Sequence, residues 1–353
     1  MLKKKISRCE ESPRLSKTSH VTIAAQILKD SGTVVALSDV LPSNLPTPTT
    51  SMKSNHTLAV AFLAAASTIA AHGADAPAPA VTFDGYAVVQ ATSVDTTSSL
   101  DLYAAKFGAT GKFGNVTGYA SLYYGGAKTD LLDAYFTVDV GGGLSITTGK
   151  FLSYMGYEAF DVPNMTQISY ANTQLGPVPA YHTGIKADYS TAVYGAGVAV
   201  VDSLYGYGNA PYKGDGSLRK PGLEAYYTYK GIKDVTIWFG AANEVATKYA
   251  FYDLWVSYAV SKTDSIGAEY IKIESEGSLW LLAYTKALDS KWSLTSRISG
   301  DSPTGGENNL KYTLSPSYSV NEHFIVRAEA SYVTSYGTTP SASTFAAQTI
   351  FKF

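Results

Sequence analysis

Apolar and polar side chains alternate in short runs through most of residues 74–353. In the last run, Phe345, Ala347, Thr349 and Phe351 occupy every second position. Successive side chains of a β-strand point to opposite faces, so this alternation predicts strands with one apolar and one more polar face. The runs lie near 81–91, 101–110, 115–124, 132–140, 144–152, 181–189, 192–201, 222–230, 233–242, 251–260, 265–273, 278–287, 291–299, 309–318, 323–333 and 344–353.

The connections between these runs alternate in length. Odd-numbered connections are long, from SVDTTSS at 93–99 to the longest at 153–180, and ESEG at 274–277 is the exception. Even-numbered connections, such as GGG at 141–143, are tight. Transmembrane β-barrels alternate short periplasmic turns with longer extracellular loops, whereas a soluble β-sandwich has no reason to do so. The pattern therefore predicts an all-β, antiparallel, up-and-down transmembrane barrel of about 16 strands, with 14 or 12 as alternatives.

The chain ends on Phe353, at the end of an apolar strand. A terminal strand of a soluble sandwich is the alternative for this stretch, but it would leave an open sheet edge, which pairing with the first strand removes. The pair Phe351 and Phe353 resembles the carboxy-terminal assembly signal of bacterial outer-membrane barrels. That resemblance implies the barrel-assembly machinery as a partner, and outer-membrane lipid and lipopolysaccharide as the surroundings.

The parity of the runs predicts which side chains face lipid and which face the barrel interior. Lipid-facing positions are Phe83, Ala87, Val89, Leu132, Ala134, Phe136, Val138, Leu254, Val256, Tyr258, Phe324, Val326, Ala328, Ala330 and Ala347. Interior positions are Asp84, Tyr86, Gln90, Asp133, Asp139, Asp253, Arg327, Glu329 and Gln348. The runs at 144–152, 265–273 and 278–287 are apolar on both parities, so their facing stays open.

An export signal precedes the barrel. From Met52 the sequence reads MKSNHTLAVAFLAAASTIAAHGADA, with one basic residue, a short apolar run and small residues around His72. This predicts a signal peptide at 52–73, cleaved after Gly73, and hence an outer-membrane location in a Gram-negative bacterium. Residues 1–51 show no apolar periodicity, and we interpret them as a disordered extension that results from a start site placed too far upstream. The alternative is a true cytoplasmic extension, which would bury the signal inside the chain.

Removal of residues 1–73 leaves 19 basic and 25 acidic side chains, a net charge of −6, which argues against nucleic-acid binding. The lone Cys9 is lost too, so no disulfide or thiol chemistry is expected. Only His182 and His323 remain as histidines, on distant strands, so we expect no metal site and no cofactor. His182 and Asp188 share one strand parity, which is too little to indicate an enzyme.

One segment resembles a known family. The sequence GKFLSYMGYEAF from residue 149, followed by YHTG from residue 181, is similar to the OmpL-like β-barrel porins. The matching residues are Gly149, Lys150, Phe151, Gly156, Tyr157, Glu158, His182, Thr183 and Gly184. The resemblance implies a porin that passes small hydrophilic solutes and ions by passive diffusion. By likeness to sixteen-stranded porins it also implies a homotrimer.

The same resemblance suggests that the third extracellular loop, at 153–180, folds inward and narrows the pore. Glu158 and Asp161 would then face basic side chains of the wall, a transverse arrangement that orients polar solutes and filters ions. The basic candidates are Lys106, Lys186, Arg297 and Arg327. In the alternative interpretation the two acids are ordinary solvated loop residues. A substrate-selective channel, a barrel enzyme and a structural or adhesive surface protein remain as alternative functions.

Overall fold

The computed structural model describes residues 80–126, 129–175, 178–204, 221–244 and 249–353. The predicted extension at 1–51 and the predicted signal peptide at 52–73 lie outside the described residues. None of the described residues forms a helix that is long and apolar enough to cross a membrane.

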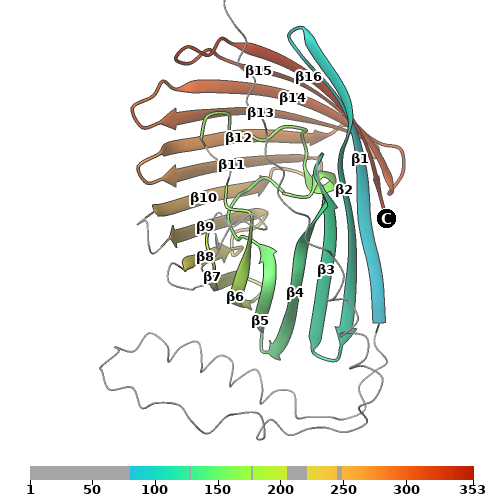
Figure 1. The fold of residues 1–353 in the computed structure, drawn as a ribbon, viewed down its shortest axis with the longest axis vertical. Coiled ribbons are helices and arrows are strands. Elements are labelled where there is room, and N and C mark those ends of the chain that lie inside the picture. The colour runs from blue at the N-terminus through green and yellow to red at the C-terminus, as the bar shows by residue number, and fades with distance from the viewer. Residues whose placement is uncertain (1–79, 127–128, 176–177, 205–220, 245–248) are drawn as a thin grey trace, which may run out of the picture. The chain divides into compact units, whose positions relative to one another are not determined.

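Sixteen antiparallel strands close into one barrel (Figure 1). The strands are β1 (Ala80–Val94), β2 (Thr97–Phe113), β3 (Val116–Tyr124), β4 (Thr129–Gly141), β5 (Leu144–Leu152), β6 (Tyr181–Ser190), β7 (Tyr194–Val201), β8 (Gly222–Tyr229), β9 (Val235–Glu244), β10 (Tyr249–Ala259), β11 (Asp264–Ile273), β12 (Gly277–Ala287), β13 (Trp292–Pro303), β14 (Asn309–Ser319), β15 (Phe324–Val333) and β16 (Ala342–Lys352). Each strand pairs with its neighbours in sequence, and β1 pairs with β16. The predicted fold class and the count of 16 strands are confirmed.

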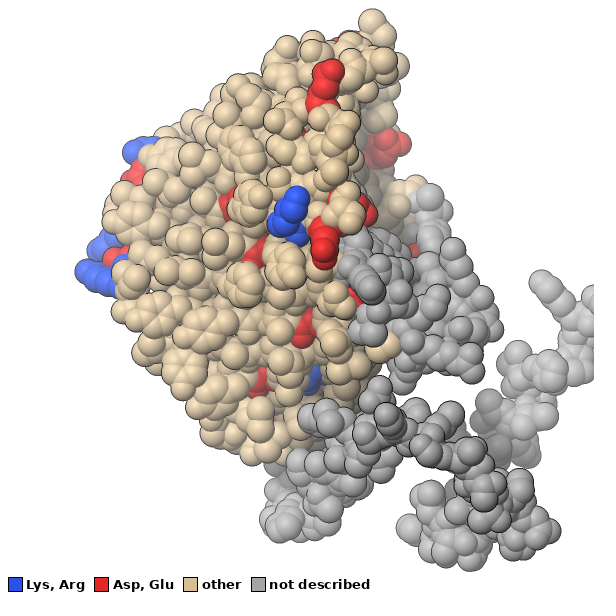
Figure 2. Space-filling view, turned by 90° about the vertical axis from the view of Figure 1, so that its left-hand side faces the viewer, with Lys and Arg blue, Asp and Glu red and all other residues tan. Residues whose placement is uncertain are grey.

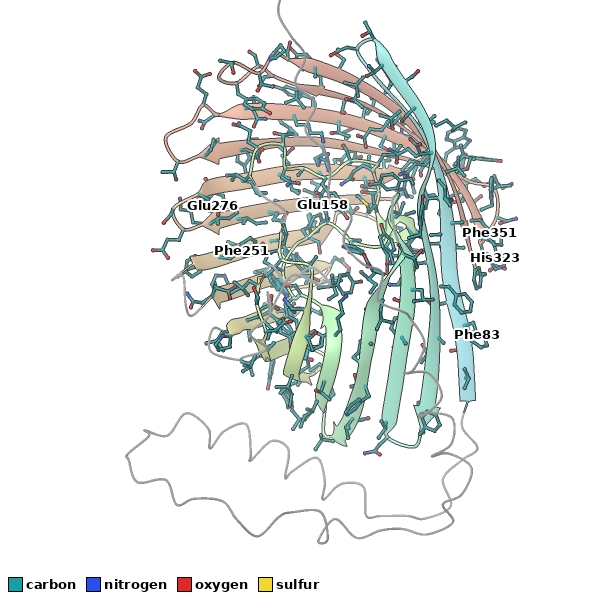
Figure 3. The ribbon with its side chains drawn as sticks, viewed as in Figure 1. Phe83, Glu158, Phe251, Glu276, His323 and Phe351 are labelled. Atoms are coloured by element: carbon teal, nitrogen blue, oxygen red, sulfur yellow. The ribbon has the colours of Figure 1, made fainter. Side chains whose placement is uncertain are left out.

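The seam between β1 and β16 closes at the last residue. The register runs from Tyr86 opposite Lys352 to Val94 opposite Thr344. Beyond it, the N–H of Phe353 donates to the carbonyl of Gly85 (3.0 Å) and the N–H of Gly85 donates back (3.2 Å). On the outer surface, the rings of Phe83 and Phe107 and those of Phe351 and Phe353 lie close to the seam, where Figure 3 labels Phe83 and Phe351.

The first hairpin differs from the expected long connection at 93–99. The pairing of β1 with β2 continues to Val94 opposite Thr97, and only Asp95 and Thr96 form the turn. Asp95 takes a positive φ of 49°, which aspartate tolerates in tight turns. Serine and threonine keep pairing as strands here because backbone hydrogen bonds do not require an apolar face. The prediction of a loop at this position was wrong.

Most of the predicted facing is confirmed. Phe83 is 61% exposed on the outer surface, whereas Gln348 and Arg327 are buried in the interior at 1% and 3%. Leu132 is the error: it is 8% exposed, and Leu131 points outward instead. Ser121 pairs with Asp133 and Leu122 pairs with Leu131, so Leu132 is the extra residue of a β-bulge. A bulge shifts the parity of the strand, and period-two alternation cannot reveal it.

The runs with ambiguous facing turn apolar residues inward. Phe151 on β5, Ile271 on β11 and Leu279 on β12 are all buried within a cluster that also contains Met155 and Leu175. Those last two residues belong to the segment between β5 and β6, so the wall is apolar on this side because the segment packs on it. The face shown in Figure 2 is mostly tan, with charged side chains scattered over it.

Candidate functional site: the segment inside the barrel

The described part of the segment between β5 and β6, residues 153–175 and 178–180, leaves the end of β5, lies in the interior and reaches β6 (Figure 1). We call it the inner loop. The N–H of Ser153 donates to the carbonyl of Ala180 (2.5 Å), which closes the loop at its base. Val162–Asn164 form a single 3₁₀ turn (η2), with a proline at its start. Figure 3 shows Glu158 of the inner loop amid the strands.

Acidic side chains of the wall hold the backbone of the inner loop. Non-helical backbone inside a barrel needs partners for its N–H groups, and carboxylates are strong acceptors. The bonds run from the N–H of Tyr154 to Glu224 (3.2 Å), Gly156 to Asp253 (2.8 Å), Tyr157 to Glu269 (2.6 Å), Ile168 and Ser169 to Glu329 (2.6 and 3.0 Å), and Thr173 and Gln174 to Asp301 (2.7 and 2.6 Å). The five acids come from β8, β10, β11, β15 and β13, so the loop is attached to much of the wall.

Basic side chains of the wall hold the carbonyls and acids of the same loop. Arg297 on β13 forms an ion pair with Glu158 and donates to the carbonyls of Ser169 (2.8 Å) and Tyr170 (3.1 Å). Lys311 on β14 donates to Tyr170 as well (2.7 Å). Arg327 on β15 donates to the carbonyl of Met165 (2.5 Å). Acids and bases of the wall therefore bind opposite ends of the loop's peptide groups.

The two acids proposed for the constriction sit in different surroundings. The Glu158 side chain is 10% exposed and, besides its pair with Arg297, accepts from Gln167 and from the N–H of Ala171 (2.7 Å), so both of its oxygens are already bound. Asp161 pairs with Lys106 on β2 (3.1 Å) and accepts from the hydroxyl of Tyr86 (3.1 Å). Its side chain is 31% exposed. Asp161 is thus the more accessible of the two charges.

Lys186 lies elsewhere. Among the described residues, its ammonium group lies over the rings of Phe151 (4.8 Å) and Tyr154 (4.9 Å) on the β5 and β6 side, a cation–π arrangement, rather than beside Glu158 or Asp161. The structure thus brings Lys106, Arg297 and Arg327 to the inner loop and places Lys186 apart from its acids.

The family motif shapes the base of the inner loop. Gly149 has φ of 126°, and a Cβ there would lie 2.2 Å from the carbonyl oxygen of Ala134 on β4. Gly156 has φ of 101°, which turns the loop toward Asp253. His182 is fully buried, with Nε2 3.4 Å from Glu224 and its ring against Phe151. The motif residues therefore shape the base of the inner loop.

Some residues that hold the loop were not among the candidates from sequence. Asp253 and Glu329 were expected inside the barrel, but the roles of Glu224, Glu269 and Asp301 were not foreseen. One signal in the sequence could have identified them: several separate strands each carry an acidic residue at an inward-facing position. Among the described residues, no group of three or more His, Cys, Asp or Glu side chains is arranged to hold a metal ion. Burial raises the pKa of the loop phenols Tyr157 and Tyr170, so both stay neutral.

Comparison with known proteins points to outer-membrane porins. The family model described as "Putative beta-barrel porin-2, OmpL-like" matches residues 102–239, which confirms the resemblance predicted from sequence. OprB of Pseudomonas putida is similar at 10% identity, with a TM-score of 0.60, over 78% of this chain and 94% of that one. A mutant of the Rh. blastica porin matches at 12% identity, with a TM-score of 0.59, over 78% and 100%.

OmpT, an outer membrane protein of Vibrio cholerae, is similar at 13% identity in its trimer form, with a TM-score of 0.56, over 78% of this chain and 100% of that one. At such identities the likeness shows the fold and no more. No curated protein matches this sequence. The chain therefore has the fold of an outer-membrane porin.

Proposed function

Because residues 102–239 match the OmpL-like β-barrel porins, we propose that this protein is a non-enzymatic channel for passive diffusion of small hydrophilic solutes and ions. The observation that carries the proposal is the closed barrel of sixteen strands with its charged side chains turned inward. Barrels of sixteen to eighteen strands leave an aqueous channel beside an inward-folded segment, whereas eight strands leave almost none.

The inner loop forms the constriction in this proposal. Acids of the loop face bases of the wall, in the pairs Asp161 with Lys106 and Glu158 with Arg297. Such an arrangement orients polar solutes and discriminates between ions. The greater exposure of Asp161 supports a mild preference for cations, set chiefly by this residue, while Glu158 and Arg327 keep the loop in place. Lys186 adds a positive charge on the opposite wall.

The setting in the cell belongs to the same proposal. Residues 52–73 would direct export and be cleaved, residues 1–51 would be absent from the mature protein, and the long connections would face outward. Phe351 and Phe353 would be recognised by the barrel-assembly machinery of a Gram-negative bacterium, and lipid and lipopolysaccharide would surround the barrel. The trimer form of the similar OmpT supports a homotrimer.

Single-channel recording in planar bilayers tests the function. The purified, folded protein should insert and give discrete, ohmic current steps in potassium chloride. A folded barrel that inserts but never conducts would overturn the proposal and favour a structural or adhesive role. Hydrolysis of ester or peptide substrates by such a non-conducting barrel would favour the enzyme alternative instead.

A further inference from the structure

Five aromatic side chains follow one another inside the barrel. In order they are Tyr154, Tyr226, Trp238, Trp255 and Tyr157, and we call them the aromatic row. Their ring centroids are separated by 4.6, 6.0, 5.7 and 5.6 Å. The three central rings are nearly parallel, at interplanar angles of 12° and 7°. The row begins and ends on the inner loop and crosses β8, β9 and β10 between.

The row faces the interior and not lipid. The outer surface of these strands is formed by the sequence neighbours Tyr227, Phe239 and Leu254, which are 48%, 47% and 45% exposed. Tyr226, Trp238 and Trp255 have the opposite parity. Trp238 is buried at 6%, whereas Tyr226 and Trp255 keep part of their surface accessible. The row thus combines a packed centre with partly open flanks.

Glycines on the inward face of the wall make room for the rings. A Cβ on Gly240 would lie 2.2 Å from the Trp238 ring, one on Gly197 would lie 2.4 Å from the Tyr226 ring, and one on Gly267 would lie 2.0 Å from the Tyr157 hydroxyl. The rings therefore lie along the wall at fixed places. A contact surface that is already in position needs no ordering when a solute arrives.

Both loop members of the row also line a cavity. Its volume is about 310 Å³, and its walls are mostly apolar, with the aromatic rings of Tyr154, Tyr157, Phe160 and Tyr170 contributing. Glu158 and Glu269 also line it. This size and this mixture of apolar walls with a few polar groups are typical of small-molecule sites.

Hydroxyl groups lie beside the row. Thr228, Thr236 and Ser257 continue the inward parity toward the short-turn end of β8, β9 and β10, and Thr236 is the direct partner of Ser257 across the sheet. The indole N–H of Trp255 is buried and has no acceptor among the described residues, so only a movement of the ring would let it reach a solute. A solute suited to this wall therefore has flat apolar faces and a rim of hydroxyl groups.

We propose that the aromatic row and the adjoining cavity bind neutral oligosaccharides during their passage through the barrel. A pyranose ring presents C–H groups on its faces, which pack on aromatic rings, and hydroxyls on its rim, which bond to polar neighbours. Spacing of 4.6–6.0 Å between rings lets a sugar reach the next ring before it leaves the last. The inference rests on the proposed channel function and names its substrate class.

Current block by maltohexaose tests the inference. The wild-type channel should show reversible, concentration-dependent closures with maltohexaose, and none with polyethylene glycol of matched hydrodynamic size. Trp255→Ala and Tyr226→Ala should each raise the half-blocking concentration about tenfold, because each removes one ring contact. The matched controls Leu254→Ala and Tyr227→Ala alter the outer face of the same strands and should leave the half-blocking concentration unchanged.

The outcomes separate the two proposals. Conduction without block by maltohexaose, or block unchanged in both row variants, overturns the inference and leaves the channel intact. Absence of conduction in the wild type overturns the channel. In that case the tryptophan fluorescence of the folded protein in detergent reports maltohexaose directly. A saturable change that Trp255→Ala abolishes supports the row, and no change overturns it.

Discussion

Two parts of the barrel wall hold the same loop by different means. Strands β13 to β15, the charged wall, bind it through Asp301, Glu329, Arg297, Lys311 and Arg327. Strands β7 to β12, the apolar wall, also supply three carboxylates that bind loop N–H groups, but they bury the loop mainly against a cluster with residues such as Val201, Phe251, Ile271 and Leu279. Figure 3 labels Phe251 on that side and Glu158 in the loop.

The two walls therefore contribute differently to the inner loop: one fixes its position, and the other supplies most of its attraction to the barrel. Hydrogen bonds to charged groups depend on distance and direction, so the charged wall fixes the peptide groups that it binds, which lie between residues 162 and 174 of the loop. Apolar contact is not directional and grows with buried area, so the apolar wall contributes attraction with less demand on geometry. Substitutions in the charged wall should therefore change the loop's course, and those in the apolar wall should chiefly change its stability.

The largest effect is expected for Arg297→Met. It leaves Glu158 buried without its partner, which costs about 3–5 kcal/mol in comparable buried pairs. The urea midpoint of the barrel in detergent should fall, and channel recordings should become noisier as the loop loses its attachment. The double variant Glu158→Gln with Arg297→Met should recover most of the midpoint. Lys286→Met, at an exposed pair with Asp264, is the control and should leave it nearly unchanged.

The next effect concerns the apolar wall. Leu279→Ala should lower the free energy of unfolding by about 2–5 kcal/mol, because it opens a cavity beneath the loop. Current noise should rise less than in Arg297→Met. Leu282→Ala changes the outer face of the same strand, where the side chain is 48% exposed, and should cost clearly less. Equal losses for both leucine variants would contradict the assigned packing.

A smaller effect separates charge from hydrogen bonding. Asp253→Asn keeps an oxygen that can accept from the N–H of Gly156, so we expect a loss of about 1 kcal/mol in unfolding free energy. Asp253→Ala removes the acceptor and should cost about 1–3 kcal/mol. Urea titrations followed by tryptophan fluorescence would measure the loss of unfolding free energy in both variants. If the asparagine variant proved the less stable of the two, the hydrogen bond would not be the interaction that matters.

The smallest expected effect is a change in ion selectivity. Asp161→Asn should shift the reversal potential under a salt gradient toward anions without loss of barrel stability. The shift should grow as salt is lowered, since the Debye length rises from about 10 Å at 0.1 M to about 30 Å at 0.01 M. Glu322→Gln, in the turn before β15, is the matched control and should leave the potential unchanged. The same potential in both variants would place Asp161 outside the conducting path.

The strands could be predicted from sequence because alternation is a local property. All sixteen runs are strands. The bulge at Leu132 was not predicted, since a period-two pattern does not reveal a bulge, and the length of the first hairpin was underestimated. The runs around Phe151, Ile271 and Leu279 were ambiguous for a physical reason. Their inward side is covered by the loop, so both faces are apolar.

The partners within the site could be predicted only in part. The segment carrying Glu158 and Asp161 was identified, and Lys106 and Arg297 were named as bases opposite to it. Which acid meets which base depends on the closure of the barrel, which brings β2 and β13 to the same loop, and no local pattern contains that information. The acceptors for the loop's N–H groups, such as Glu269, were missed because their partners are backbone groups. Almost every residue type carries the same backbone N–H, so the sequence does not mark which one is bound.

The closing seam sets an order on folding. The Gln348 side chain donates to Gln90 across that seam, between residues that are 258 apart in the sequence. Contacts of such separation form late, because a long chain must first be ordered. Until β16 arrives, the edge of β1 stays unpaired beside the exposed rings of Phe83 and Phe107, and it is open to any other strand. Before closure, this edge is therefore a place where a wrong strand can pair, and the arrival of β16 removes it.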